Sequence, residues 1–375
     1  MKYLLCGYYG YRNLGDDLML KVITDRITLA DRDSQIYVKC NGTSGFDQDI
    51  LSRIMPVCID DLLLKDGNKV INWLDYIVKL LRIISKIDVL IIGGGGLFLD
   101  KGKHNGSLFT LFLISIFSRI FRKKVYITGV GIDLLRHPTS RFYLKWILKC
   151  ADSVYIRENY GYRLAKSLIG EPGSRLFLTK DILYSSAYID SGFIPARNRN
   201  IGISLTDYYL EYDPSKDKRD NFVREFSRFL KNSAALDRTV KFFIFQDKES
   251  GSDRKIAEDI LRASVKSALN YEIIDLRAAD DLNEAYRDLG MVIGMRFHAL
   301  VFSSILNIPF IGLNHEKKIE EICSDFDMPY IDIDNLSSDN LSRQVSNLFA
   351  SGKIPEVTRD MVARAEQNFD FMRKG

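Results

Sequence analysis

The 375-residue sequence is poor in cysteine and histidine, the residues from which disulfide frameworks and most structural metal sites are built. The cysteines are odd in number and widely separated, with no C-x-x-C pair and no histidine nearby at metal-ligand spacing; they are Cys6, Cys40, Cys58, Cys150 and Cys323. This pattern indicates reduced core thiols in a cytosolic protein, and it gives no reason to expect a metal site.

Long apolar runs, a signal peptide and a large excess of charge are also missing. The longest apolar stretch, Ser107–Ser118, is shorter than the roughly 18–20 residues that a membrane-spanning helix needs. The first residues lack the apolar segment of a signal peptide. A net charge of +4 is too small to indicate nucleic-acid binding. We therefore expect a cytoplasmic protein that neither crosses a membrane nor binds nucleic acid.

Motifs of common hydrolases are absent as well. The sequence has no G-x-S-x-G elbow and no H-E-x-x-H pair, and His104, His137 and His315 each stand alone. These absences disfavour serine triads and hydrolytic metal sites.

Short runs rich in valine, isoleucine and leucine alternate with longer segments of helical spacing along the whole chain, which is typical of parallel sheets covered by helices. The chain is also longer than the roughly 250–300 residues at which single cores stop growing. The sequence therefore predicts an α/β fold of two Rossmann-like doubly wound domains, residues 1–190 and 200–375, with a linker within Tyr184–Asn200. Ligands are expected in a cleft between the domains, at the carboxyl ends of the strands.

In the second domain, the segment Ile293–Leu300 places Arg296 and His298 where a strand turns into a helix. A helix N-terminus carries about half a positive charge, so a cation there costs on the order of 0.3–1 kcal/mol. Two cationic donors beside backbone N–H groups therefore indicate a socket for an anionic ligand. On this interpretation, Arg296→Ala leaves stability unchanged or slightly improved. The alternative is that a carboxylate pairs with Arg296 and that His298 is a core histidine.

The glycine-rich loop Gly7–Gly15 joins the first strand to the first helix, but it is neither a dinucleotide G-x-G-x-x-G nor a Walker motif. Asp16 and Asp17 follow in the first helical turn, where they would repel a phosphate. We therefore predict a hydroxyl-bearing ligand such as a sugar, with Asn13 and Asp16 as hydrogen-bonding groups and Gly15 allowing close approach. The alternative is an ordinary turn before a well-capped helix.

Four consecutive glycines, Gly93–Gly96, follow a buried apolar run. Each is less favourable than alanine by about 0.5–1 kcal/mol within an element, and a packing reason for all four is hard to find. Close approach of a ligand to the backbone of Gly94 and Gly95 is the better explanation. Asp100, just beyond them, either caps the next helix or binds the ligand.

Three further charged residues follow or precede predicted elements. Arg157 ends one predicted strand and Asp181 follows another, so both are expected to face the cleft, although either is equally well explained as half of a structural ion pair. Lys318 opens another helix with positive charge, against the dipole. Its alternative is a solvated surface lysine.

Taken in order, these segments resemble the polysaccharide pyruvyl transferase family over nearly the whole chain; they are Gly7–Asp17, Gly93–Asp100, Tyr155–Glu158, Asp181, Arg296–Ala299 and the region of Lys318. The resemblance implies a fold similar to that of GT-B glycosyltransferases. It also implies transfer of the enolpyruvyl group of phosphoenolpyruvate onto two sugar hydroxyls, giving a pyruvate ketal. Arg157, Arg296 and His298 are then expected to contact phosphoenolpyruvate, and the glycine-rich loops to hold the acceptor. The chain departs from the family pattern at Thr206, where many members carry an arginine.

The expected chemistry accounts for these residue types. Phosphoenolpyruvate carries a carboxylate and a phosphate, which suit arginine forks. Its methylene carbon must be protonated near neutral pH, and His298, next to Arg296, is the expected donor. The reaction needs no redox cofactor and no metal.

Two other classes of function remain open. A GT-B glycosyltransferase would use a nucleotide sugar, but many retaining members have two glutamates eight positions apart in the second domain, and no such pair is present. A sugar-binding protein without activity would have no use for cations at helix starts. The acceptor sugar, its attachment to a lipid and the oligomeric state are not determined by the sequence.

The segment Leu108–Phe121, followed by Arg122, Lys123 and Lys124, also has two interpretations. One is a buried helix between two strands. The other is a membrane-surface helix with a basic end, which would bring the protein to a lipid-linked acceptor at the inner face of the membrane.

Overall fold

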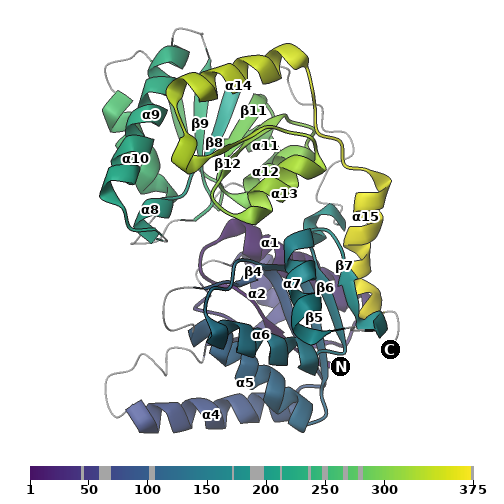
Figure 1. Cartoon of the computed structure of the whole chain (residues 1–375). Helices are drawn as coiled ribbons and strands as arrows, with labels where there is room; N and C mark the ends of the chain where they lie inside the picture. Colours follow the sequence, from purple (N-terminus) through teal and green to yellow (C-terminus); the bar gives the residue numbers. More distant parts are fainter. Residues whose placement is uncertain are drawn as a thin grey trace. The chain divides into compact units, whose positions relative to one another are not determined.

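The computed structural model describes residues 1–43, 46–58, 69–100, 106–170, 173–185, 198–211, 213–234, 238–246, 252–264, 269–277 and 282–372. The chain forms two compact units (Figure 1). One comprises Met1–Ser186 together with Arg359–Gly375, and the other comprises Ala187–Thr358. Most of the linker expected within Tyr184–Asn200 lies outside the described residues.

The first unit is built on a seven-stranded parallel sheet in the order β3-β2-β1-β4-β5-β6-β7. Its strands are β1 (Lys2–Cys6), β2 (Gln35–Lys39), β3 (Ile54–Val57), β4 (Val89–Phe98), β5 (Lys124–Ile132), β6 (Ser153–Ile156) and β7 (Leu176–Leu178). The direction of winding reverses between β1 and β4, as in a doubly wound sheet. The central β4 is buried along most of its length, which accounts for its uninterrupted run of apolar residues.

The helices of the first unit pack against its sheet and against one another. They are α1 (Leu14–Ala30), α2 (Gln48–Arg53), α4 (Lys69–Lys86), α5 (Gly106–Ile120), α6 (Pro138–Cys150), α7 (Asn159–Ile169) and α15 (Arg359–Glu366), with short 3-10 turns at Gly173–Arg175, Ile182–Ser185 and Gln367–Met372. In α4 the buried residues Tyr76, Leu80 and Ile84 recur every four positions, so they form a single stripe. This stripe shares one apolar core with residues of α5, α6 and the sheet, such as Ile114 and Leu144.

The second unit repeats the same plan with six parallel strands in the order β10-β9-β8-β11-β12-β13. Its strands are β8 (Asn200–Ser204), β9 (Thr239–Ile244), β10 (Asn270–Asp275), β11 (Leu289–Gly294), β12 (Phe310–Asn314) and β13 (Tyr330–Asp332). Its helices are α8 (Tyr208–Glu211), α9 (Lys216–Ala234), α10 (Asp253–Ser264), α11 (Leu282–Tyr286), α12 (Phe297–Ile305), α13 (Lys317–Asp325) and α14 (Ser338–Ser351), with a 3-10 turn at Ile333–Asn335. The prediction of two doubly wound α/β sheets is confirmed.

The last part of the chain differs from the prediction. Residues 200–375 were expected to form the second domain, but the segment from Arg359 onward belongs to the first unit. The reason is Asn368, whose buried side chain uses all four of its hydrogen-bonding positions there. Its Oδ1 accepts from Gly129 N and Thr179 Oγ1, each at 3.0 Å, and its Nδ2 donates to the carbonyl oxygens of Lys180 and Ala365, each at 2.9 Å.

Candidate functional site

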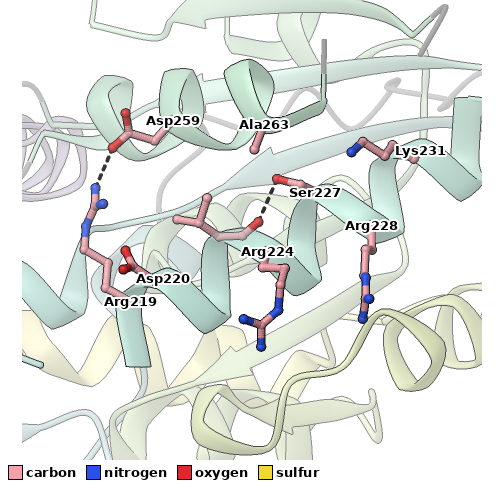
Figure 2. A pocket seen from close by; sticks show the side chains of 9 residues that line it. Arg219, Asp220, Arg224, Ser227, Arg228, Lys231, Asp259 and Ala263 are labelled. Carbon is pink, nitrogen blue, oxygen red and sulfur yellow. Dashed lines mark hydrogen bonds and ion pairs between the residues drawn. The ribbon is translucent and has the colours of Figure 1, made fainter. Parts of the chain in front are cut away.

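A hollow of about 520 Å³ opens between α9 and α10 of the second unit (Figure 2). Four cations line it, namely Arg219, Arg224, Arg228 and Lys231. Arg219 is held by Asp207 at 2.6 Å and by Asp259 at 2.7 Å, so the most buried of these charges is already neutralised. None of the residues singled out by the sequence lines this hollow, and we do not assign the candidate site to it.

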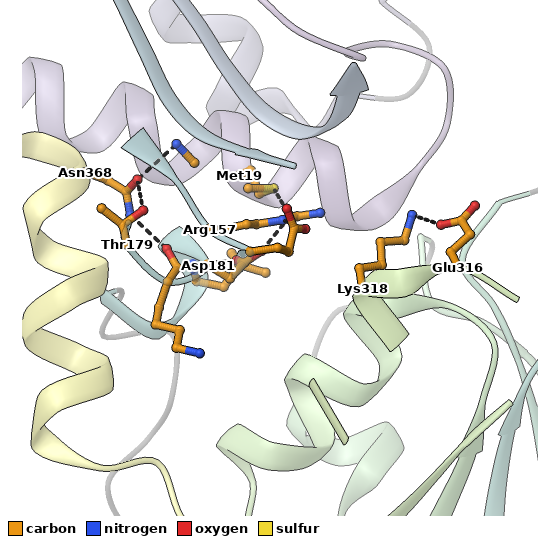
Figure 3. A network of polar contacts seen from close by, with 11 residues as sticks. Met19, Arg157, Thr179, Asp181, Glu316, Lys318 and Asn368 are labelled. Carbon is orange, nitrogen blue, oxygen red and sulfur yellow. Dashed lines mark hydrogen bonds and ion pairs between the residues drawn. The ribbon is translucent and has the colours of Figure 1, made fainter. Parts of the chain in front are cut away.

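Arg157 and Asp181 of the first unit are two halves of one buried ion pair (Figure 3). Arg157 follows β6 directly, and Asp181 lies three residues beyond the neighbouring β7. Nε of Arg157 donates to Glu158 Oε1 at 2.7 Å, and Nη1 donates to Asp181 Oδ2 at 2.6 Å. Burial by itself lowers the pKa of Arg157, but the two carboxylates raise it above its ordinary value, so the guanidinium stays charged. We call Arg157, Glu158 and Asp181 the Arg157 cluster.

Asp16 and Glu158 bring two carboxylates to the same edge of the first sheet. A Cβ on Gly95 of β4 would come within 1.9 Å of Asp16 Oδ1, and a Cβ on Gly131 of β5 would come within 2.6 Å of Glu158 Oε1. Since β4 and β5 pair directly, the two carboxylates lie over neighbouring strand ends. Asp16 also raises the pKa of Arg157, so its charge acts on the Arg157 cluster. This edge is therefore rich in negative charge, which suits hydroxyl groups and not phosphate.

The glycine run has packing reasons that the sequence did not reveal. β4 continues through the glycines to Phe98, and Gly94 and Gly95 have φ of +73° and +86°, a conformation that favours glycine. A Cβ on Gly94 would also lie 3.1 Å from the hydroxyl of Tyr9, which donates to Gly93 O at 2.5 Å. The argument that packing cannot explain these glycines is therefore wrong for Gly94 and Gly95. Contact of their backbone with a ligand stays a prediction.

The loop before α1 is tied down by Asp17. Its Oδ1 accepts from Gly10 N at 3.3 Å. Burial raises the pKa of Asp17 to about 8, and the charges of Asp16 and Asp47 add to the shift. Gly15 lies buried in the first turn, and Asn13 stands at the N-cap without a capping hydrogen bond from its side chain.

Asp100 has a structural role. Its Oδ2 accepts from the backbone N of Arg136 at 2.5 Å and of His137 at 3.0 Å, directly before α6. It therefore holds the segment that leads into α6. Its expected contact with a ligand stays a prediction.

Arg296 of the second unit forms a bidentate pair with Asp253, which the sequence left as the alternative to an open socket. Its Nη2 lies 2.5 Å from Asp253 Oδ1, and its Nε lies 3.1 Å from the same oxygen. Asp253 is buried at the start of α10, and its Oδ2 also accepts from Phe245 N at 3.0 Å and Gln246 N at 2.9 Å, just beyond β9. Burial raises the pKa of Asp253 in spite of Arg296. The pair thus ties the ends of β9 and β11 together.

A second ion pair lies after β12, beside Arg296. Lys318 contacts Glu316, and His315 Nε2 lies 3.7 Å from Glu316 Oε1. Burial by itself raises the pKa of Glu316, yet Lys318 and His315 bring it down to about 2. Burial lowers the pKa of His315, and Arg296 contributes in the same direction, which indicates that the two side chains are near each other. Lys318 is therefore more than a solvated surface lysine.

His298 lies buried in the first turn of α12, with its ring edge-on to Phe297 at 5.4 Å. Because β11 and β12 pair directly, the residues that follow them come to one edge of the second sheet. We call Arg296, His298, His315, Glu316 and Lys318, with Asp253, the Arg296 cluster.

Sequence reasoning missed Asp253, Glu158, Glu316 and His315. His315 was judged to stand alone, and this is wrong, because Glu316 and Lys318 follow it on the same turn. A histidine followed by charges of both signs at a strand end was a usable signal. The sequence gives no such signal for Asp253, because this residue lies 43 positions from Arg296. His104 lies outside the described residues.

Comparison with known families gives one match, to the model of the polysaccharide pyruvyl transferase family, over residues 13–317. Among curated protein sequences, none matches significantly.

Several solved structures are similar to this chain over nearly its whole length. The UDP-GlcNAc 2-epimerase of Methanocaldococcus jannaschii, solved with UDP-GlcNAc and UDP, has 13% identity and a TM-score of 0.64, with 100% of each chain covered. MurG of Acinetobacter baumannii has 11% identity and a TM-score of 0.56, with 100% of each chain covered. The lipopolysaccharide outer core galactosyltransferase WaaB has 10% identity and a TM-score of 0.55, covering 100% of this chain and 99% of its own. These likenesses show a GT-B fold of two Rossmann-like domains, as expected.

Arg296→Ala is expected to destabilise the second unit, contrary to the argument from the helix dipole alone. Removal of a cation from the N-terminus of α12 stabilises the helix by at most about 1 kcal/mol. Loss of the pair leaves Asp253 buried without its cation, at a cost of roughly 3 kcal/mol, the low end for a broken buried pair, because its two backbone donors remain. Urea unfolding measures the difference, and Asp253→Asn in the same chain should recover part of it. An unchanged midpoint for Arg296→Ala would show that the pair does not support the fold.

Asp17 is expected to make stability fall as pH rises toward 8. Its pKa is raised from 3.8 to about 8 in the folded chain, so folding takes up a proton between these values. The resulting stability is fully present below about pH 4 and lost as pH rises through 8, by up to about 1.4 kcal/mol per pH unit. Asp17→Asn keeps the acceptor for Gly10 N and should flatten this dependence in urea unfolding at several pH values. The exposed Asp33→Asn is the control. Equal slopes for both variants would contradict the assignment.

Proposed function

Because the chain belongs to the polysaccharide pyruvyl transferase family, we propose that it transfers pyruvate from phosphoenolpyruvate to two hydroxyls of a sugar in a cell-surface polysaccharide or its precursor. The products are a cyclic pyruvate ketal and phosphate. The observation that carries the proposal is the gathering of two cations and two histidines at one edge of the second sheet, each cation oriented by a carboxylate.

The Arg296 cluster is the proposed donor side. Asp253 fixes the plane of the Arg296 guanidinium, and a planar fork held in this way binds a carboxylate or phosphate with little further loss of side-chain entropy. Lys318, drawn toward Glu316, supplies a second positive charge for the other anionic group of phosphoenolpyruvate. The backbone N–H groups at the start of α12 follow Arg296 directly, where an anion is favoured.

A proton must reach the methylene carbon of phosphoenolpyruvate. We assign this proton to His298, in the first turn of α12 beside Arg296. One sugar hydroxyl adds to the neighbouring carbon as the methylene carbon takes up the proton and becomes a methyl group. The bond to the phosphate oxygen then breaks, phosphate leaves, and the second hydroxyl closes the ketal as it loses its proton.

The edge of the first sheet is the proposed acceptor side. Asp16 and Glu158 accept hydrogen bonds from sugar hydroxyls and take up their protons, and Asn13 is a further hydrogen-bonding group. Gly95 lets the Asp16 carboxylate lie against the backbone of β4, and contact of the acceptor with the backbone of Gly94 and Gly95 is part of the proposal. Arg157 was expected to contact phosphoenolpyruvate; we propose instead that it positions Glu158, because its guanidinium is held by Glu158 and Asp181. The contact of Asp100 with the acceptor stays a prediction, and its Oδ2 already accepts from the backbone before α6.

Phosphoenolpyruvate at about a hundred times its dissociation constant should stabilise the chain by roughly 2.7 kcal/mol in a thermal-shift assay, and UDP-GlcNAc should not. Lys318→Ala should reduce the ligand-induced shift, because a charge-assisted contact is lost and affinity falls by about tenfold or more.

The adjacent Lys317→Ala is the matched control, because Lys317 is exposed and pairs with Glu320 on the same helix. An equal reduction in both variants would remove Lys318 from the donor side. Stabilisation by UDP-GlcNAc with none by phosphoenolpyruvate would reject pyruvyl transfer in favour of a glycosyltransferase.

A further inference from the structure

An exposed apolar face runs over α4 and α6 of the first unit. On α4, Ile71 and Leu74 are 62% and 60% exposed, and Val78 is also exposed on the same side. On α6, Phe142 and Trp146 lie four positions apart on one side of the helix and are 51% and 40% exposed. Large apolar side chains are usually buried. A cluster of them exposed to solvent therefore indicates a binding surface.

The helices α4, α5 and α6 are neighbours in the first unit (Figure 1), and aromatic rings contact one another between them. The ring of Trp73 lies 6.1 Å from that of Phe109 on α5. Phe109 in turn lies 5.4 Å from Tyr143 on α6, and Phe142 lies 6.3 Å from Trp146. The rings therefore join α4 to α6 through α5.

The fold does not need these outward side chains. The opposite side of each helix already supplies the core, through residues such as Leu80 of α4, Ile114 of α5 and Ile147 of α6. For α5 the buried interpretation of Leu108–Phe121 is the correct one, since Leu108, Leu111 and Ile114 are buried. None of the described helices is long and apolar enough to cross a membrane.

The charges around the face are almost all positive. α6 carries Arg141, Lys145 and Lys149 and no acidic residue. On α4 the only acidic residue is Asp75, and Lys79 pairs with it at 3.2 Å. Lys149 also lies over the ring of Trp146, 5.3 Å from its centre. A second copy of the chain on this face would bring like charges together, whereas an anionic surface complements them.

We propose that the outward faces of α4 and α6 bind the surface of a membrane that contains anionic phospholipid. Trp146 sits at the level of the headgroups, the apolar side chains of α4 enter the boundary of the acyl chains, and the lysines and arginines contact the phosphates. This docking face does not rest on the proposed function, since it would hold a transferase or any other enzyme next to lipid-linked substrates.

Flotation of the whole chain with phosphatidylcholine vesicles, with and without phosphatidylglycerol, tests the proposal. We expect binding only to the anionic vesicles, with a blue shift of tryptophan emission, because Trp146 reports on this face. Ile71→Gln with Leu74→Gln should lower the partition coefficient by about tenfold or more. Leu29→Gln, which changes an exposed leucine elsewhere in the same unit, should leave it unchanged.

Charge reversal of Arg141, Lys145 and Lys149 to Glu should abolish binding, whereas the same reversal at Arg122, Lys123 and Lys124 should not. Thermal melts confirm that each variant is folded. Absence of binding to anionic vesicles, or equal binding by all variants, would overturn the proposal. So would a dimer of the wild-type chain in lipid-free solution that Ile71→Gln with Leu74→Gln dissociates, because the face would then be a protein interface.

Discussion

A guanidinium taken out of water must keep a counter-charge beside it, and this constraint organises both sheets. The free energy of an unpaired buried charge exceeds the gain from most other single contacts. Arg157 therefore lies between Glu158 and Asp181, at the ends of β6 and β7, and Arg296 lies against Asp253, between the ends of β9 and β11. Each pair joins segments that are distant in sequence, so the loops that carry the candidate site residues have fixed positions.

The same pairs divide the chemistry between the sheets. In the first unit carboxylates outnumber the guanidinium that they surround, which suits sugar hydroxyls. In the second unit the cations of the Arg296 cluster are oriented by buried carboxylates and accompanied by two histidines, which suits an anionic donor and a proton transfer. Under the proposed function, the first unit would hold the polyhydroxylic acceptor and the second unit the small anionic donor.

The sequence predicted the sheets better than the contacts. Alternation of apolar runs and helical spacing was enough to predict two doubly wound units, because buried parallel strands are apolar on both faces. The alternation of apolar runs did not predict β3 and β13, which are edge strands of four and three residues, and β3 contains Pro56. The argument that Arg296 is misplaced at a helix start correctly marked an unusual residue, but no local pattern points to Asp253, 43 positions away. The packing of Asn368 in the first unit could not be predicted for the same reason, because its partners Gly129 and Thr179 are distant in sequence.

The most direct test of the central claim follows the pyruvyl group itself. The chain would be incubated with phosphoenolpyruvate labelled with carbon-13 at the carbon that becomes the ketal centre, with nucleotide sugars and with saccharides from the cell envelope of the source organism. We predict a labelled ketal carbon in the saccharide by NMR, with one phosphate released for each label transferred. An unlabelled saccharide that has gained a sugar from the nucleotide donor would contradict the account.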